Sequence, residues 1–186
     1  MVLLDPSIEH QDRRFASVFG PGAGNLNGLR VHAAACLAAA EQGALPSEDP
    51  KLATCTPKPQ QPAAVAAARL AEALRPSTWR AQVSEIDSLW TTTSDEVDAG
   101  RSAYGDLPLI VLTADGTYAG NPEPARARID AVWCGLHREI AGRSTRGGER
   151  LVTGSSHMMM FDRPDAVIQA IDEVIAQSQA PAPNRP

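Results

Sequence analysis

The 186-residue sequence has few aromatic residues, no excess of positive charge and no long apolar run. Aromatic residues make up 4% of the chain, and 31 alanines supply much of its 43% hydrophobic content. The bulk of a core must therefore come from a few segments rich in leucine, isoleucine and valine. No segment approaches the ~20 apolar residues that a membrane-spanning helix needs. The opening residues also lack the basic stretch and apolar core of a secretory signal.

Positive charge is scarce, since 17 lysine and arginine residues stand against 22 aspartate and glutamate residues, a formal net charge of −5. Binding to nucleic acid or to an anionic membrane needs concentrated positive charge, so neither partner is expected. The three cysteines, Cys36, Cys55 and Cys134, are odd in number and widely spaced, which predicts neither a disulfide framework nor a zinc site. The four histidines show no paired spacing of metal ligands, so no metal is expected. These features predict a soluble, cytoplasmic, globular protein.

The C-terminal half alternates between strand and helix signals. Residues 107–114 form a continuous apolar run, which is typical of a strand buried on both faces of a parallel sheet. Apolar residues recur at helical spacing from Ile129 to Ile140, which predicts an amphipathic helix that ends at Gly142. A short strand is expected over residues 149–154.

A last helix is predicted after Asp162, which is expected to cap it, with Pro164 in its first turn. The spacing predicts that Val167, Ile171, Val174 and Ile175 lie on its buried face. At the other end of the chain, residues 2–5 are typical of the end of a buried strand.

The expected order is strand, long helical insertion, strand, helix, strand, helix, which indicates an α/β fold with about three parallel strands. The insertion contains a proline-rich loop over residues 45–62. The expected parts are a first core strand and loop over residues 1–18, a helical insertion over 19–104, a C-terminal core over 105–177 and a disordered tail over 178–186.

Three ionisable residues follow the predicted strands: Asp5, Asp115 and His157. In open α/β sheets, ligands bind at the carboxyl ends of the strands. A histidine held there can act as a general base near neutral pH if a carboxylate fixes its tautomer. The alternatives are a surface-loop histidine at position 157, an Asx-type turn at Asp5 and an Asp-Gly turn at Asp115.

Five segments carry a resemblance to a known family. They are Val-Leu-Leu-Asp-Pro-Ser at residues 2–7, the block at 105–113, Trp133 with Leu-His-Arg-Glu-Ile-Ala at 136–141, Val-Thr-Gly-Ser-Ser-His at 152–157 and the segment 162–171. In order and spacing they resemble the last part of an α/β-hydrolase. The first segment is similar to the sixth strand of that family, and the helical insertion occupies the place of the family's helical cap.

The resemblance implies that His157 is the catalytic histidine of an esterase-like Ser-Asp-His triad. It also implies a catalytic acid after the sixth or the seventh strand, which places it at Asp5 or at Asp115. Members whose sixth strand ends in Leu-Asp-Pro-Ser favour Asp5, and both positions stay open. The family acts on small-molecule substrates, and the resemblance implies neither a metal nor an organic cofactor.

The cap of this family roofs an acyl or alkyl pocket. Trp79, Trp90 and Met158 are therefore candidate residues of a substrate pocket. The alternative is that these three side chains belong to the ordinary hydrophobic core.

The sequence departs from the family at the nucleophile, because it contains no Gly-x-Ser-x-Gly elbow. Ser155 and Ser156 are too close in sequence to His157 to present a hydroxyl to its ring in elbow geometry. A base and an acid without a nucleophile cannot carry out acyl transfer. We therefore expect a truncated hydrolase-like chain that is inactive and marginally stable alone. It would need an N-terminal hydrolase portion, supplied by a complementing chain or by residues missing from this sequence. The alternative is a non-catalytic remnant or a small-molecule-binding protein that uses the cap pocket.

Overall fold

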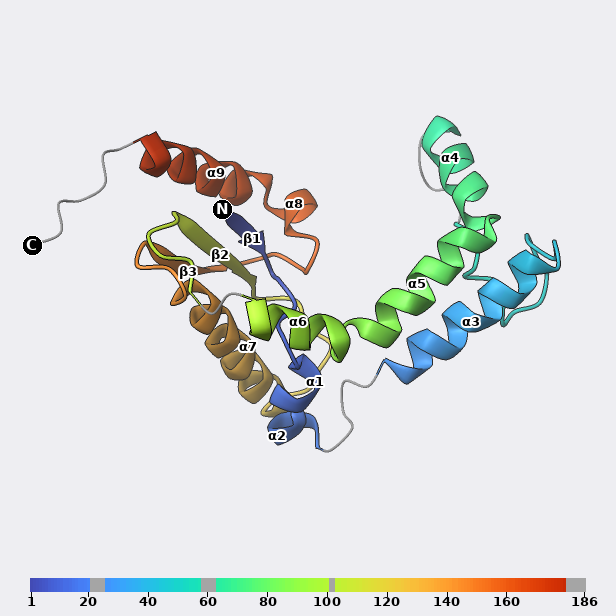
Figure 1. Cartoon of the computed structure of the whole chain (residues 1–186), viewed down its shortest axis with the longest axis horizontal. Coiled ribbons are helices and arrows are strands. Elements are labelled where there is room, and N and C mark those ends of the chain that lie inside the picture. Colours follow the sequence, from blue (N-terminus) through green and yellow to red (C-terminus); the bar gives the residue numbers. More distant parts are fainter. Residues whose placement is uncertain (21–25, 58–62, 101–102, 180–186) are drawn as a thin grey trace, which may run out of the picture. The chain divides into compact units, whose positions relative to one another are not determined.

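The computed structural model describes residues 1–20, 26–57, 63–100 and 103–179 (Figure 1). The chain divides into two compact units. The first, called the sheet unit, comprises Met1–Ala23 and Glu96–Pro186, and the second, called the helical unit, is Gly24–Asp95. The helical unit is shorter at both ends than the insertion expected over residues 19–104. None of the described helices is long and apolar enough to cross a lipid bilayer.

The sheet unit contains a three-stranded parallel sheet in the order β1-β2-β3. Its strands are β1 (Val2–Leu4), β2 (Leu109–Ala114) and β3 (Gly147–Val152). In the register, Leu3 lies opposite Val111, which lies opposite Glu149. The prediction of an α/β fold with about three parallel strands and flanking helices is confirmed.

The central strand β2 is buried along its whole length, as its continuous apolar sequence predicts. Successive side chains alternate between the two faces of a strand. Leu109 and Val111 pack against α7 (Ala125–Ala141), while Ile110 and Leu112 pack on the opposite face. That face is covered by α8 (Met159–Asp162) and α9 (Pro164–Gln179), and Figure 1 shows α7 and α9 on opposite sides of the sheet.

Helix α7 buries the face that the sequence predicts. Ile129, Trp133, Leu136 and Ile140 are all at most 5% exposed, and Gly142 caps the C-terminal end of the helix. Burying side chains of this size contributes roughly 1.5–3 kcal/mol each, so this face anchors the helix to the sheet.

The prediction for the last helix is wrong in two details. Asp162 does not cap α9 but ends the short helix α8, and Pro164 is the first residue of α9. Of the four residues predicted to be buried, Val167 and Val174 pack against the core with the buried Ala170. Ile171 and Ile175 are instead 42% and 48% exposed. The helix carries two adjacent apolar stripes, and the stripe around the small Ala170 lets its backbone approach the sheet closely.

The short helices α1 (Gln11–Arg14) and α2 (Ala16–Phe19) follow β1. Phe15, at their junction, is buried, and its ring centroid lies 5.7 Å from that of Trp133 and 5.6 Å from that of Tyr118. This aromatic group extends the core on the α7 side of the sheet.

The helical unit is built on α3 (Asn27–Glu41), α4 (Ala63–Ala73) and α5 (Pro76–Ser88). Helix α6 (Thr92–Gly100) spans the boundary between the two units. Arg30 pairs with Asp87, and Arg80 pairs with Glu41. Because each pair joins the start of one helix to the end of the other, α3 and α5 run antiparallel.

A disulfide joins Cys36 on α3 to Cys55, and the prediction of no disulfide is therefore wrong. The chain after α3 folds back on the helix, which places the two Cα atoms 5.5 Å apart across a sequence separation of 19. Sequence spacing alone does not report this proximity. Cys134, on α7, is a free cysteine.

The structure describes only part of two segments that are expected to be irregular. Residues 178 and 179 belong to α9 and not to a disordered tail, while residues 180–186 lie outside the described residues. The expected loop over residues 45–62 consists of turns and bends as far as residue 57, and residues 58–62 again lie outside the described part.

Candidate active site

Asp5 follows β1 directly, at the carboxyl end of the sheet, and its side chain is fully buried. Its backbone has φ 45°, in the left-handed region, which aspartate tolerates better than most residues. The Asp5 N–H donates to the Leu112 carbonyl at 2.8 Å and so continues the ladder with β2. Left-handed non-glycine residues are enriched at functional sites, where surrounding contacts hold them in place.

The Asp5 carboxylate accepts four hydrogen bonds. Oδ1 accepts from the Ala114 N–H at 3.0 Å and from Trp133 Nε1 at 2.8 Å. Oδ2 accepts from the Thr117 hydroxyl at 2.5 Å and lies 3.0 Å from His157 Nδ1. Burial alone would raise the pKa of Asp5, but these hydrogen bonds overcome it and hold the pKa below its ordinary value. Asp5 is therefore ionised at neutral pH.

His157 lies in the loop after β3 and contacts Asp5 across 152 residues of sequence. Its side chain is 60% exposed, in contrast to the buried carboxylate beside it. An ionised carboxylate accepts hydrogen bonds, so Nδ1 carries the proton in this contact. Nε2 is then the unprotonated nitrogen of the neutral ring, and it has no hydrogen-bond partner within the described part of the chain.

Asp115 does not contact His157 but fastens the loop that carries it. Its carboxylate accepts from the Gly154 N–H at 2.9 Å and from the Ser155 N–H at 3.2 Å. The next residue, Gly116, donates from its N–H to the Ser155 carbonyl at 2.9 Å. A Cβ at Gly116 would lie 2.6 Å from that oxygen, so the approach requires glycine. Of the two candidate acids, the structure brings Asp5 and not Asp115 to the histidine.

The two serines before His157 are engaged elsewhere. The Ser155 hydroxyl donates to the Val152 carbonyl at 3.0 Å. The Ser156 hydroxyl donates to Asp162 Oδ2 at 2.5 Å. Neither is presented to the imidazole, which agrees with the expectation that this segment holds no nucleophile.

A second histidine, which unlike His157 is buried, supports the end of β1. His137 is fully buried, and its Nε2 lies 3.0 Å from the carbonyl of Pro6, the residue after Asp5. Its ring packs on Trp133 with centroids 4.3 Å apart, and Nδ1 lies 2.8 Å from the Thr113 hydroxyl. Burial lowers the pKa of His137. This residue therefore positions the backbone beside Asp5 and the indole that donates to it.

The predicted pocket residues belong to different units. Trp79 is 8% exposed, donates from Nε1 to the Ala73 carbonyl at 2.8 Å and lies in the core of the helical unit. Trp90 is half-buried in the turn after α5. Met158, in the sheet unit, is 47% exposed and comes directly before α8. A pocket shared by the three stays a prediction.

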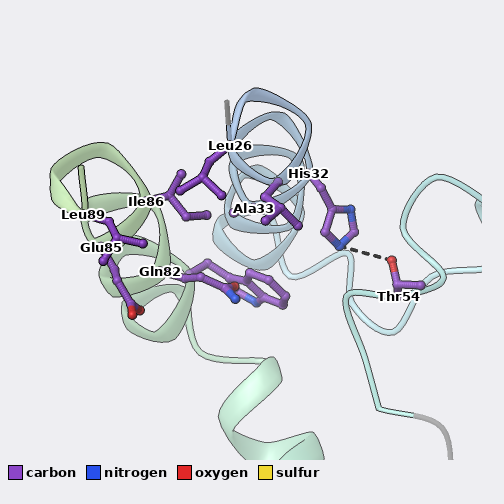
Figure 2. Close-up of a pocket in the computed structure, with 10 residues that line it drawn as sticks. Leu26, His32, Ala33, Thr54, Gln82, Glu85, Ile86 and Leu89 are labelled. Carbon is purple, nitrogen blue, oxygen red and sulfur yellow. Dashed lines mark hydrogen bonds between the residues drawn. The ribbon is translucent and has the colours of Figure 1, made fainter. Parts of the chain in front are cut away.

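The helical unit contains a cavity of about 320 Å³ between α3 and α5 (Figure 2). Leu26, Ile86 and Leu89 give it an apolar wall, and Trp79 also lines it. Figure 2 shows His32 at the margin of this cavity, where its Nε2 lies 3.1 Å from the Thr54 hydroxyl. The cavity is large enough for a small organic molecule.

Comparison of the chain with family models, curated proteins and solved structures found no match.

Sequence reasoning missed two residues of the site. Trp133 was expected on the buried face of its helix and in one of the segments that resemble the hydrolase family, and no role was predicted for Thr117. Both donate to Asp5, and no spacing signal links them to it across more than 100 residues. The signal that was available is the burial of an indole, since a buried Trp N–H usually finds an acceptor.

Proposed function

We propose that His157 and Asp5 are the general base and the orienting acid of an esterase-like, α/β-hydrolase type of reaction. The observation that supports this most strongly is the His157–Asp5 contact at the carboxyl end of a parallel sheet. It joins an exposed imidazole to a buried, ionised carboxylate. This is the arrangement that a Ser-His-Asp mechanism needs for its base.

In this mechanism His157 Nε2 accepts the proton of a serine hydroxyl as the serine attacks an ester carbonyl. It then returns the proton to the leaving alcohol, and a second cycle with water releases the acid. Asp5 holds the Nδ1–H tautomer and stabilises the imidazolium that forms. The sequence contains no nucleophile elbow, so the serine comes from a complementing N-terminal hydrolase chain.

The remaining features follow from the same proposal. In this proposal the helical unit takes the place of the family's cap, and Trp79, Trp90 and Met158 remain candidate residues for contact with a small-molecule ester. The net charge of −5 argues against nucleic acid or an anionic membrane as a partner. We place the protein in the cytoplasm, where the Cys36–Cys55 pair would spend part of its time as a dithiol.

The test purifies the protein from its source cells through a C-terminal tag, together with any chain that associates with it. Hydrolysis of p-nitrophenyl acetate and butyrate is measured, and fluorophosphonate-biotin labels activated serines. We expect one labelled serine in the associated chain. His157→Ala should lower the rate about 10⁶-fold, as loss of the histidine of a serine triad does.

A matched pair of variants gives the control. Asp5→Asn should lower the rate strongly, whereas Asp165→Asn removes an exposed carboxylate that pairs only locally with Arg163 and should leave the rate unchanged. The proposal fails if no serine is labelled, or if hydrolysis survives His157→Ala at the wild-type rate.

The cavity in the helical unit favours a second candidate function, the non-catalytic binding of a small apolar molecule. This is tested with 8-anilinonaphthalene-1-sulfonate as the probe. A binding protein should enhance its fluorescence equally in the wild type and in His157→Ala, and lose the effect in Ile86→Gln, which makes the cavity wall polar. Binding that changes with His157 would argue against this second function.

A further inference from the structure

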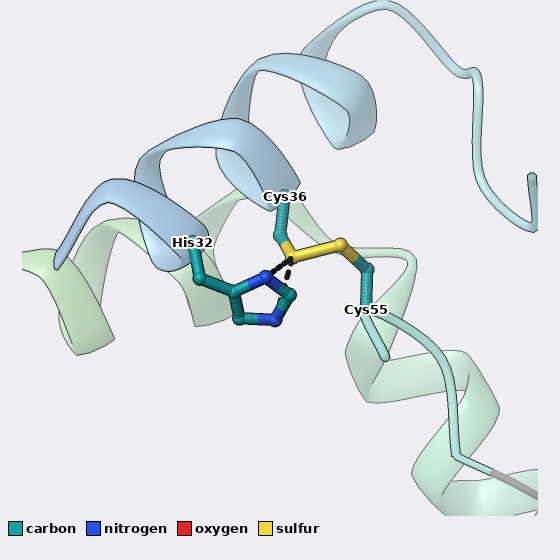
Figure 3. Close-up of side chains that lie close together, drawn as sticks. All are labelled: His32, Cys36 and Cys55. Atoms are coloured by element: carbon teal, nitrogen blue, oxygen red, sulfur yellow. Dashed lines mark hydrogen bonds between the residues drawn. A yellow bond between two sulfur atoms is a disulfide. The ribbon is translucent and has the colours of Figure 1, made fainter. Parts of the chain in front are cut away.

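Three potential metal ligands meet in the helical unit, outside the site described above. His32 and Cys36 lie one turn apart on the same face of α3, and Cys55 reaches them from the following loop (Figure 3). One ligand atom from each residue lies within 4.8 Å of the other two. Cys36 and Cys55 are at most 1% exposed. Among the described residues this is the one group of three or more His, Cys, Asp or Glu side chains that are close enough together to hold a metal ion.

The distances agree with a tetrahedral metal site. Zinc binds thiolate sulfur at about 2.3 Å and imidazole nitrogen at about 2.0 Å, so neighbouring sulfur and nitrogen ligands lie about 3.5 Å apart. Cys36 Sγ lies 3.5 Å from His32 Nε2. Two sulfur ligands would lie about 3.8 Å apart, roughly 1.7 Å more than in a disulfide. Small rotations of the two cysteine side chains after reduction supply this separation.

We propose that the helical unit contains a metal site that is controlled by the redox state of its cysteines. In this site, reduced Cys36 and Cys55 bind a thiophilic metal such as zinc together with His32 Nε2. Formation of the disulfide removes both thiolates and expels the metal. The sequence signal for this site is the spacing of His32 and Cys36, four residues apart on a helix, which a search for paired histidines alone does not detect.

The reaction balances with a thiol–disulfide couple as co-reactant. Binding of Zn²⁺ to the dithiol forms two Zn–S bonds and releases two protons. Oxidation by a low-molecular-weight disulfide then forms the Cys36–Cys55 bond and breaks the bond of the oxidant. In that step the oxidant gains two electrons from the two thiolates and takes up two protons to give two thiols, while Zn²⁺ leaves.

The surroundings leave the fourth coordination position to water. His32 and Thr54 line the cavity of about 320 Å³, which gives water a route to the site. The Thr54 hydroxyl, 3.1 Å from His32 Nε2, gives up this contact when the metal takes the nitrogen, and it then faces the metal-bound water. Trp79 holds the His32 ring in an edge-on arrangement with centroids 6.4 Å apart. Three protein ligands and one position open to water distinguish this arrangement from closed structural zinc sites, which have four protein ligands.

The test titrates the full chain with Co²⁺, whose tetrahedral thiolate complexes absorb in the near ultraviolet and visible, and then displaces it with Zn²⁺. The phosphine-reduced wild type should bind about one Co²⁺ per chain with thiolate-to-cobalt absorption. The same protein after oxidation, with the disulfide verified by mass, should bind none. Equal binding by both forms, or no thiolate absorption in the reduced form, overturns the proposal.

Variants identify the ligands. Cys36→Ser and Cys55→Ser should abolish the thiolate absorption, and His32→Gln should weaken Co²⁺ binding at least tenfold. Cys134→Ser is the matched control, because it removes the free cysteine of the sheet unit and should bind like the wild type. Loss of binding in Cys134→Ser, or unchanged affinity in His32→Gln, contradicts the assignment. If a cysteine variant fails to fold, the comparison of reduced and oxidised wild type still decides the question.

Discussion

Two substitutions of Asp5 separate the contribution of its negative charge to stability from that of its hydrogen-bond acceptors. Asparagine removes the charge alone, and alanine removes the acceptors as well. Asparagine has the same shape and also tolerates the left-handed backbone at this position. Its amide oxygen keeps the hydrogen bonds from the Ala114 N–H and Trp133 Nε1. Its NH₂ group replaces the oxygen that faces Thr117 and His157. The Thr117 hydroxyl can turn to accept a hydrogen bond from that group. The substitution therefore weakens the charge-assisted contacts of Oδ2 but leaves few donors without an acceptor.

We expect Asp5→Asn to lower the free energy of unfolding by about 1–3 kcal/mol. Asp5→Ala leaves two buried donors, the Ala114 N–H and the Trp133 indole, without an acceptor. At about 1–3 kcal/mol for each unsatisfied group, the loss is about 2–6 kcal/mol. Urea denaturation followed by circular dichroism measures both values. Equal losses in the two variants would refute the reasoning that the Asp5 carboxylate is the acceptor that organises this end of the sheet.

Four further predictions follow from the same contacts. Gly116→Ala should displace the loop that carries His157 and lower the free energy of unfolding by about 1–3 kcal/mol, seen as a lower urea midpoint. Alanine at Gly120, which has open space around it, should change the midpoint little. Cys36→Ser should lower the free energy of unfolding of the oxidised protein by about 3 kcal/mol, the value for closing a loop of this length, and an unchanged midpoint would contradict this. The folded-state pKa of Asp5 is depressed, so its contribution to stability is present above the unfolded pKa and is lost as the pH falls. The stability advantage of the wild type over Asp5→Asn should therefore shrink between about pH 5 and pH 2, and a constant difference across that range would be inconsistent with the lowered pKa. Finally, the isolated chain should self-associate, because Phe161 is 76% exposed and α9 carries further exposed apolar residues. Light scattering after size exclusion measures its mass, and a sharp monomer would contradict this prediction.

The strands and α7 were predictable because their signals are local. A continuous apolar run specifies a strand buried on both faces, and β2 is such a strand. The spacing of Ile129, Trp133 and Ile140 likewise specifies the buried face of α7. The buried face of α9 was predicted only in part, because two apolar stripes lie side by side on the helix. Val167 and Val174 pack against the core, whereas Ile171 and Ile175 are exposed. Packing against the sheet selected the stripe with the small residue Ala170.

The site was predictable only in part. His157 and two candidate acids follow from the rule that ligands bind at the carboxyl ends of parallel strands. The choice between Asp5 and Asp115 depends on which carboxylate the loop after β3 approaches, and that depends on contacts distant in sequence. The Cys36–Cys55 disulfide escaped prediction for the same reason. Both features are set by how the chain folds back on itself and not by any local pattern.

The tautomer of His157 tests the central claim most directly. If His157 and Asp5 are a base–acid pair, Asp5 fixes the proton on Nδ1 and leaves Nε2 available as the base. Nitrogen-15 imidazole spectra of the isolated chain, recorded where the ring is neutral, should show a protonated Nδ1 and an unprotonated Nε2 for His157. The same spectra of Asp5→Asn should show the proton on Nε2. A wild-type His157 that carries its proton mainly on Nε2 would contradict the assignment of the pair.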